Sequence, residues 1–199
     1  MIWFVALPSS FALCLIPLPL VSALFEHGET SRQDALAISY ATAIYGLGLP
    51  AFMIQKLLQP LYFAREDTKT PLRFAVISML LNAILAIALL NVMGWIAVAV
   101  AASASAWVTS ILLWISAKKF GRAASVLKTS TNRIKRTFFA SLVMGIILWA
   151  ISQNLYTVMQ TSAERVFFAI ALVFAGSAIY LIIVYMLKAF PKNSEKALN

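Results

Sequence analysis

The stretch "ISMLLNAILAIALL", residues 77–90, decides the fold class of this chain. It contains no charged residue, and its side chains do not alternate between apolar and polar as the strands of a membrane barrel would. With its flanks it forms an apolar run over 72–92, which is close to the length of about 20 residues that a helix needs to cross a bilayer. The stretch therefore predicts a membrane-spanning α-helix.

Similar apolar runs lie on both sides of this one. The six predicted helices cover 2–25, 35–62, 72–92, 95–117, 138–157 and 163–187. The composition agrees, because 62% of the 199 residues are hydrophobic and only 12% are charged, whereas a soluble domain contains roughly 25% charged residues. We therefore expect an all-α polytopic membrane protein with six transmembrane helices.

The basic residues are distributed unevenly over the connections between these helices. The segments 63–73 and 118–136 and the tail from 188 hold 13 of the 16 lysines and arginines, whereas 26–34 and 153–165 hold one each. Because cytoplasmic loops are enriched in basic residues, the first group of connections and both termini are predicted to face the cytoplasm. Loops beside anionic lipid account for most of the net charge of +9, so no nucleic-acid partner is predicted.

The connection after the second predicted helix is densely charged and reads "YFAREDTKTPLRF" over 62–74. Thr70 before Pro71 predicts a helix start, with the threonine hydroxyl as the capping group. Two interpretations of the charges are open. They form a solvated turn of little energetic weight, or Arg65 and Asp67 form a cytoplasmic gate that holds the helix ends in one state of a transport cycle.

The second predicted helix contains a helix-breaking segment, "YGLGLP" over 45–50. Pro50 cannot donate to the carbonyl of Gly46, and glycines at 46 and 48 lower the cost of bending. Interrupted helices near the midplane occur at transporter hinges, and kinks also occur through packing alone. Gly46, Gly48 and Pro50 are therefore candidate hinge residues.

Four polar residues inside the predicted helices are candidates for contact with a substrate: Gln55, Lys56, Gln59 and Asn82. Intramembrane polar side chains usually face protein or water. Lys56 has the alternative of extending to the lipid headgroups, and Asn82 has the alternative of a hydrogen bond between helices.

The sequence offers no catalytic machinery and no metal or cofactor site. It has one histidine, His27, in a predicted outer loop, and neither a hydrolytic triad nor a glycine-rich phosphate loop can be assembled from it. We therefore predict that the chain is not an enzyme.

The segment "LGLPAFMIQKLLQPLYFAREDTKTPLRFAVISMLLN", residues 47–82, resembles the most recognisable stretch in the second half of the MurJ/MviN family, the lipid II flippases of peptidoglycan synthesis. The stretch before it, "ALPSSFALCLIPLPLVSALFEHGETSRQD", resembles the helix and outer loop that precede it in the family. One departure is the order of Tyr62 and Phe63, since members commonly have Phe-Tyr there.

The resemblance implies the later part of a two-lobed flippase, and the family's first lobe and its cavity arginines have no counterpart here. It implies four helices of the second lobe over 1–120, a basic cytoplasmic loop over 121–137, two C-terminal helices over 138–190 and a cytoplasmic tail over 191–199. In the family the last two helices form a groove, open to lipid, for the polyprenyl tail.

The function implied by the resemblance is the movement of a polyprenyl-pyrophosphate-linked peptidoglycan precursor across the bacterial inner membrane by alternating access. Its partners would be that substrate, membrane lipid and the missing N-terminal helices as a separate chain. Two alternatives stay open: half of a multidrug or polysaccharide-precursor exporter, and a non-transporting remnant that packs with other membrane proteins.

Overall fold

The computed structural model describes residues 2–26, 30–120, 131–155 and 161–187, and the regular structure in these ranges is helical. The helices are α1 (Ile2–Leu15), α2 (Pro17–Phe25), α3 (Arg32–Phe63), α4 (Lys69–Met93), α5 (Ile96–Ala117), α6 (Thr131–Leu155) and α7 (Ser162–Met186). Five of them, α3 to α7, are long and apolar enough to cross a membrane, and the bent pair of α1 and α2 gives a sixth candidate when the pair is taken as one broken span. The predicted all-α, six-span architecture is confirmed for the described residues.

The first span is broken, although the sequence was expected to form one helix over 2–25. The chain bends by 78° between α1 and α2, at Ile16, whose φ of −127° and ψ of 43° are not helical. Pro17 follows at the first position of α2, where its missing N–H costs nothing and its fixed φ suits a helix start. Pro17 therefore marks the point at which α1 has ended and α2 begins.

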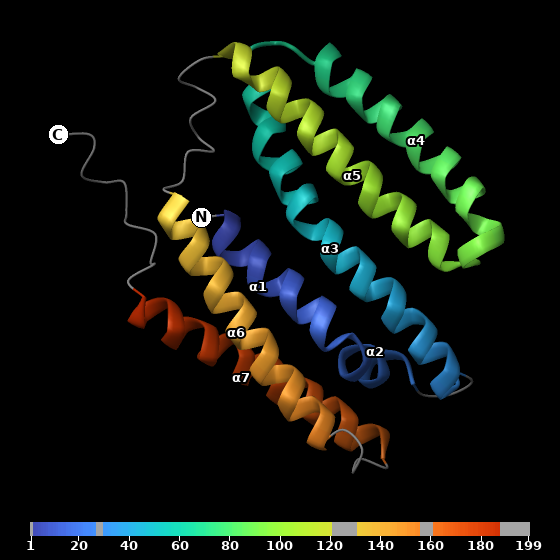
Figure 1. Cartoon of the computed structure of the whole chain (residues 1–199), viewed down its shortest axis with the longest axis vertical. Coiled ribbons are helices and arrows are strands. Elements are labelled where there is room, and N and C mark those ends of the chain that lie inside the picture. The colour runs from blue at the N-terminus through green and yellow to red at the C-terminus, as the bar shows by residue number, and fades with distance from the viewer. Residues whose placement is uncertain (1, 27–29, 121–130, 156–160, 188–199) are drawn as a thin grey trace.

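Neighbouring helices lie side by side in the order α4, α5, α3, α1 and α6 across the molecule, with α7 beside α6 (Figure 1). The short helix α2 contacts both α3 and α7. The molecule is thus divided into a layer of α3, α4 and α5 and a pair of α6 and α7, with α1 and α2 between them.

Two apolar clusters hold these parts together. The first joins α3 to α5 through Ile54, Leu58, Tyr62, Leu113 and Ala117. The second joins Ile16 to α6 and α7 through residues that include Met144, Leu148, Leu172, Tyr180 and Val184. On the side facing α3 and α4, α5 buries alanine and serine, such as Ala99, Ala101, Ser103 and Ser110, and these small side chains let helix backbones approach closely.

Helix α4 packs mainly on α5 and leaves its other faces open. Large apolar side chains project from it, among them Ile87 at 73% exposure and Val92 at 82%. In a soluble protein such a surface would drive aggregation, but in a membrane protein it suits contact with lipid or with further helices.

Helix α6 begins at Thr131, earlier than the expected start at 138, and so takes up the last part of the predicted loop over 121–137. Residues 121–130 of that loop, and the predicted tail, lie outside the described residues. The early start places Arg136 on the helix, where its Nη1 donates to the carbonyl oxygen of Leu187 at the end of α7, 3.0 Å away. A cation at that position also offsets the negative end of the α7 dipole.

Candidate functional site

The proline segment of α3 is the first candidate region, and its backbone is satisfied by a neighbouring helix. Because Pro50 has no N–H, the carbonyl of Gly46 loses its helical donor. The hydroxyl of Ser10 on α1 donates to that carbonyl oxygen at 2.7 Å and is buried there. A buried carbonyl left without a donor would be costly, so this bond stabilises α3, which continues through Pro50 as one helix.

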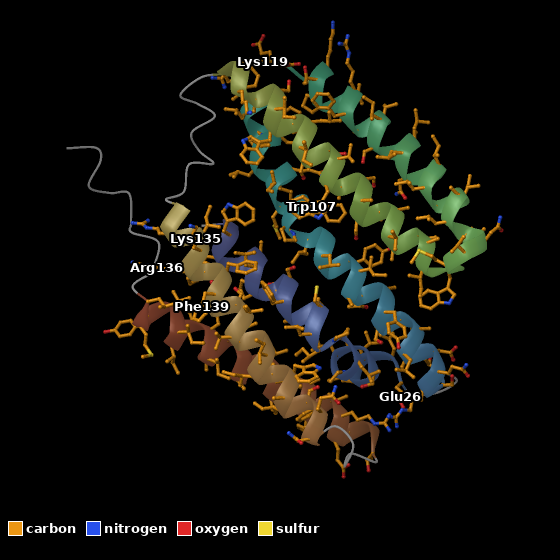
Figure 2. All side chains as sticks on the ribbon, viewed as in Figure 1. Glu26, Trp107, Lys119, Lys135, Arg136 and Phe139 are labelled. Carbon is orange, nitrogen blue, oxygen red and sulfur yellow. The ribbon has the colours of Figure 1, made fainter. Side chains whose placement is uncertain are left out.

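Further carbonyls on either side of Pro50 accept hydrogen bonds from α1 and α5. The donors are Cys14 to Ala43, Ser103 to Ile44, Trp107 to Leu47 and Ser110 to Ala51, at 2.7 to 3.3 Å. Figure 2 labels Trp107 between α5 and α3. The proline segment is therefore joined to both neighbouring helices by side chains that donate to its backbone.

The two predicted hinge glycines are sites of close helix approach. A Cβ at Gly46 would lie 3.0 Å from both Cys14 Sγ and Leu13 Cβ. A Cβ at Gly48 would lie 2.8 Å from Ser103 Oγ and 3.2 Å from the Cα of the same serine. Both glycines therefore allow α3 to pack closely against a neighbouring helix. Their role as hinges together with Pro50 stays a prediction.

Replacing Gly48 by alanine is expected to destabilise the protein by about 1–3 kcal/mol. Alanine normally favours a helix over glycine, but here its methyl group would force α5 away from α3, because the short side chain of Ser103 and its backbone Cα occupy the space. The matched control is Gly176→Ala, whose nearest neighbour is the flexible end of the Leu148 side chain at 2.8 Å. Thermal unfolding in detergent measures both variants, and a Gly48→Ala variant as stable as the original chain would contradict the prediction.

The four predicted substrate residues do not gather into one cluster. Gln55 Nε2 donates to the carbonyl oxygen of Ala106 on α5 at 2.8 Å, so it takes part in helix packing. Lys56 is exposed and Gln59 is half-buried. Asn82 is half-buried on α4, and α5 lies between α4 and α3 (Figure 1). In the described part of the chain no hydrogen bond joins Asn82 to α3, and the substrate-binding role of these residues stays a prediction.

The charged turn between α3 and α4 has a well-defined backbone geometry. The amides of Glu66 and Asp67 donate to the carbonyls of Phe63 and Tyr62, at 3.0 and 3.1 Å. Glu66 has a φ of 58°, the left-handed conformation with which many helices end. This pattern closes the end of α3 and aims the next residue, Asp67, at the start of α4.

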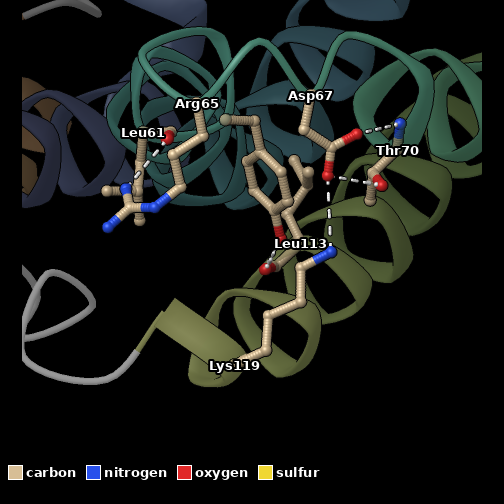
Figure 3. A network of polar contacts seen from close by, with 7 residues as sticks. Leu61, Arg65, Asp67, Thr70, Leu113 and Lys119 are labelled. Atoms are coloured by element: carbon tan, nitrogen blue, oxygen red, sulfur yellow. Dashed lines mark hydrogen bonds and ion pairs between the residues drawn. The ribbon is translucent and has the colours of Figure 1, made fainter.

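Asp67, and not Thr70, supplies the capping group of α4. Its carboxylate accepts from the backbone amide of Thr70 at 3.0 Å and from the Thr70 hydroxyl at 2.8 Å (Figure 3). The predicted cap at the threonine hydroxyl is therefore wrong, because α4 already begins at Lys69 and the charged Asp67 side chain accepts from the amide of Thr70 itself. These two bonds lower the pKa of the Asp67 carboxyl, so they are present above its ordinary pKa and are lost as the pH falls through the lowered value.

The partner of Asp67 across the turn is Lys119, just beyond the end of α5. Lys119 Nζ lies 3.3 Å from Asp67 Oδ2 (Figure 3). Arg65 instead donates to the carbonyl of Leu61 on its own helix at 3.3 Å and lies over the ring of Phe120, 4.5 Å from its centre. The two predicted gate residues are thus not paired with each other, and both reach the end of α5.

The sequence did not single out the residues of α5 that receive this turn. Lys119 and Phe120 lie two and three residues after the predicted helix 95–117, and in the sequence Lys119 is one of several basic residues in that segment. Tyr62 is fully buried and its hydroxyl donates to the carbonyl of Leu113 at 2.7 Å. The exchanged order of Tyr62 and Phe63 therefore places the hydroxyl at the buried position, while Phe63 is exposed.

An apolar groove runs along α7. It consists of one cavity of about 350 Å³ among α1, α6 and α7 and a second of about 340 Å³ between α2 and α7. The two cavities share the lining residues Leu20 and Val173, and we call them together the α7 groove. None of the four predicted substrate residues lines it.

Metal chemistry finds no support in the described ranges. They hold no group of three or more His, Cys, Asp or Glu side chains that could bind a metal ion. His27 lies outside the described residues.

Comparison with known proteins gives a consistent result. The family model described as "Lipid II flippase MurJ" matches residues 1–168. A probable lipid II flippase MurJ of Rhizobium meliloti is 34% identical over 185 residues, which cover 92% of this chain and 34% of that protein. A probable lipid II flippase MurJ of Vibrio cholerae is 29% identical over 99% of this chain and 38% of its own length.

A solved structure has the same arrangement. A lipid II flippase MurJ in an inward closed conformation superposes with a TM-score of 0.74 and 26% sequence identity, over 92% of this chain and 36% of that one. The chain therefore spans somewhat more than a third of the length of the relatives it matches.

Proposed function

The chain belongs to the lipid II flippase MurJ family, and on that premise we propose that it is part of a flippase for the lipid-linked precursor of peptidoglycan. The observation that carries the proposal is the 34% identity over 92% of the chain to a probable lipid II flippase. The helices shared with the solved flippase support it. The substrate would be an undecaprenyl-pyrophosphoryl disaccharide-pentapeptide that moves from the cytoplasmic to the outer leaflet of the inner membrane.

Transport by this chain requires a second group of helices. A transporter cavity normally lies between two structural repeats that rock against each other in alternating access, and this chain spans only 34–38% of the length of its curated relatives. The preceding helices of such a flippase would supply the other wall of the cavity, either as a separate chain or as part of a longer one. Gln55, Lys56, Gln59 and Asn82 are the candidates on this side.

The α7 groove is suited to the polyprenyl tail of the substrate. Its walls are almost entirely apolar and come from α1, α2, α6 and α7. An isoprenoid chain has no polar group to satisfy, so such a groove can hold it by apolar contact alone. The pyrophosphate and sugars would lie elsewhere, toward the missing wall of the cavity.

The proposal is tested in cells depleted of their own flippase. Coexpression of this chain with the N-terminal helices of a relative should restore lipid II to the outer leaflet, where an added enzyme that cleaves lipid II can reach it. Accumulation of lipid II in the inner leaflet, with both chains present in the membrane in normal amounts, would contradict the proposal.

The orientation of the helices gives a separate prediction. Because the basic residues concentrate at alternate connections, reporters fused after residues 68, 127 and 195 are expected to report a cytoplasmic location and those after 30, 93 and 160 a periplasmic one. Paired reporters that are active on opposite sides of the membrane make each fusion its own control. A periplasmic signal at 127 would overturn this orientation.

A further inference from the structure

The short helix α2 connects the two parts of the molecule and is joined to α1 at a non-helical residue. Ile16 is not helical and Pro17 removes a backbone donor at the bend of 78°. No continuous helix therefore fixes the direction of α2 relative to α1, and Ile16 at the bend is itself buried against α6 and α7. The position of α2 must therefore be set by its side contacts.

Most side contacts of α2 are apolar. Its buried residues are Pro19, Val21, Ser22 and Ala23, and the Ser22 hydroxyl donates to the carbonyl of Pro19 in the same helix. Apolar contact is not directional, so it does not by itself fix the distance between α2 and α7, and a cavity of about 340 Å³ lies between these two helices.

A directional contact between described residues ties the end of α2 to α7. Glu26, the residue after α2, forms an ion pair between its Oε1 and Arg165 Nη1. The side chains are 10% and 16% exposed, so water screens this pair much less than it screens Asp67 and Lys119, at 24% and 51%. Figure 2 labels Glu26 at the end of the molecule opposite Lys119.

The position of Arg165 in α7 is unfavourable for a cation that has no acidic partner. It lies in the first turn of α7, where the helix dipole disfavours a cation. Glu164 already completes a capping box with Thr161 at this helix start. The helix start therefore does not need Arg165 as a cap, and its ion pair with Glu26 offsets the unfavourable interaction with the dipole.

The same end of α2 forms a wall of the α7 groove. Leu20, Ala23 and Leu24 line it from one side, and Val166 and Ala169 from the other. Leu24 and Val166 are close in sequence to the two members of the ion pair. The distance between α2 and α7 at the ion pair thus determines how wide the groove is at this end.

We propose that the Glu26–Arg165 ion pair is a latch that holds α2 against α7 and sets the width of the α7 groove. The two residues are positioning residues, since they act through the helices that line the groove. This inference rests on the proposed function for the role of the groove, as the site of the polyprenyl tail, but the latch is a property of the chain itself.

Cross-linking between α2 and α7 tests the latch in membranes. Leu24→Cys and Val166→Cys are introduced together with Cys14→Ser, which removes the native thiol, and a short thiol-reactive reagent joins them. We expect Glu26→Gln and Arg165→Gln each to lower the cross-linking yield several-fold, and the reversed pair Glu26→Arg with Arg165→Glu to recover most of it. Lys119→Gln, which removes a charge from the ion pair at the opposite end, is the matched control and should leave the yield unchanged.

A second cysteine pair separates latch opening from general unfolding. Phe11 and Phe138 contact each other between α1 and α6, with ring centres 5.2 Å apart, and cysteines at these positions should cross-link equally in all variants. Unchanged α2–α7 yields in both single variants would overturn the latch. The latch would also be overturned if Glu26→Arg with Arg165→Glu gave the normal α1–α6 cross-link but did not recover the α2–α7 cross-link. If the latch results hold while lipid II is not moved, the proposed function fails and the latch stands.

Discussion

Cells depleted of their lipid II flippase are expected to lyse when they express this chain alone and to grow when they also express the N-terminal helices of a relative. The physical reason is that a transporter cavity lies between two groups of helices, and this chain supplies only one of them. The groove that the described residues form is apolar, whereas a pyrophosphate in the membrane must be paired with charges or polar groups. Without the second wall the polar head of lipid II has no path across the bilayer.

The measurement is growth after depletion, together with the amount of each chain in the membrane. Equal amounts of this chain in the two strains show that lysis does not come from degradation. A third strain with only the N-terminal helices shows that those helices do not act alone. Growth with this chain alone would prove that it needs no partner and would overturn the two-part proposal.

Hydrophobic runs predicted the helices well because the bilayer imposes their length and composition. The expected ranges 35–62, 72–92 and 95–117 agree closely with α3, α4 and α5. The first run was predicted as one helix although Pro17 and Pro19 interrupt it, because hydropathy does not show whether a proline bends a helix or ends it. The early start of α6 was not predicted because its first turns contain Arg133, Lys135 and Arg136. Such a cluster of charges is typical of a loop, and a hydrophobicity pattern does not place it in a helix.

The contacts of the candidate site were harder to predict from the sequence, because they join residues that are far apart in the chain. The pattern located Pro50 and the carbonyl that it leaves without a donor, but nothing near position 50 indicates that Ser10 supplies the bond. The charge cluster at 65–67 was recognised, but its partner Lys119 was one of several lysines and arginines in a basic segment. Such pairings depend on which helix ends the fold brings together.

The charges of the α3–α4 turn are expected to control transport more than stability. Asp67 joins the start of α4 to the end of α5 through Thr70 and Lys119. If this connection forms in only one state of the transport cycle, its loss shifts the balance of states. In a reconstituted two-part flippase we expect Asp67→Ala to lower the flipping rate by about tenfold, within the usual range of such couplings, with unchanged membrane abundance.

The choice of companion variants follows from the contacts. Lys119→Ala removes the ion pair but leaves the cap on Thr70, so its effect should be smaller than that of Asp67→Ala. Arg65→Ala removes the contact with the Phe120 ring and tests the other predicted gate residue. Exchanging the charges, Asp67→Lys with Lys119→Asp, restores the ion pair without the cap and should recover part of the lost rate.

The exchange variant decides between the gate and a solvated turn. Exposed ion pairs contribute little to stability. If the turn has no role in transport, the variants Asp67→Ala, Lys119→Ala and Arg65→Ala should therefore all flip lipid II at the normal rate. That result would reduce Asp67 to a helix cap. A rate that falls in the single variants and rises again in the exchanged pair requires the charges to meet during transport, because the cap on Thr70 is absent from both Asp67→Ala and the exchanged pair.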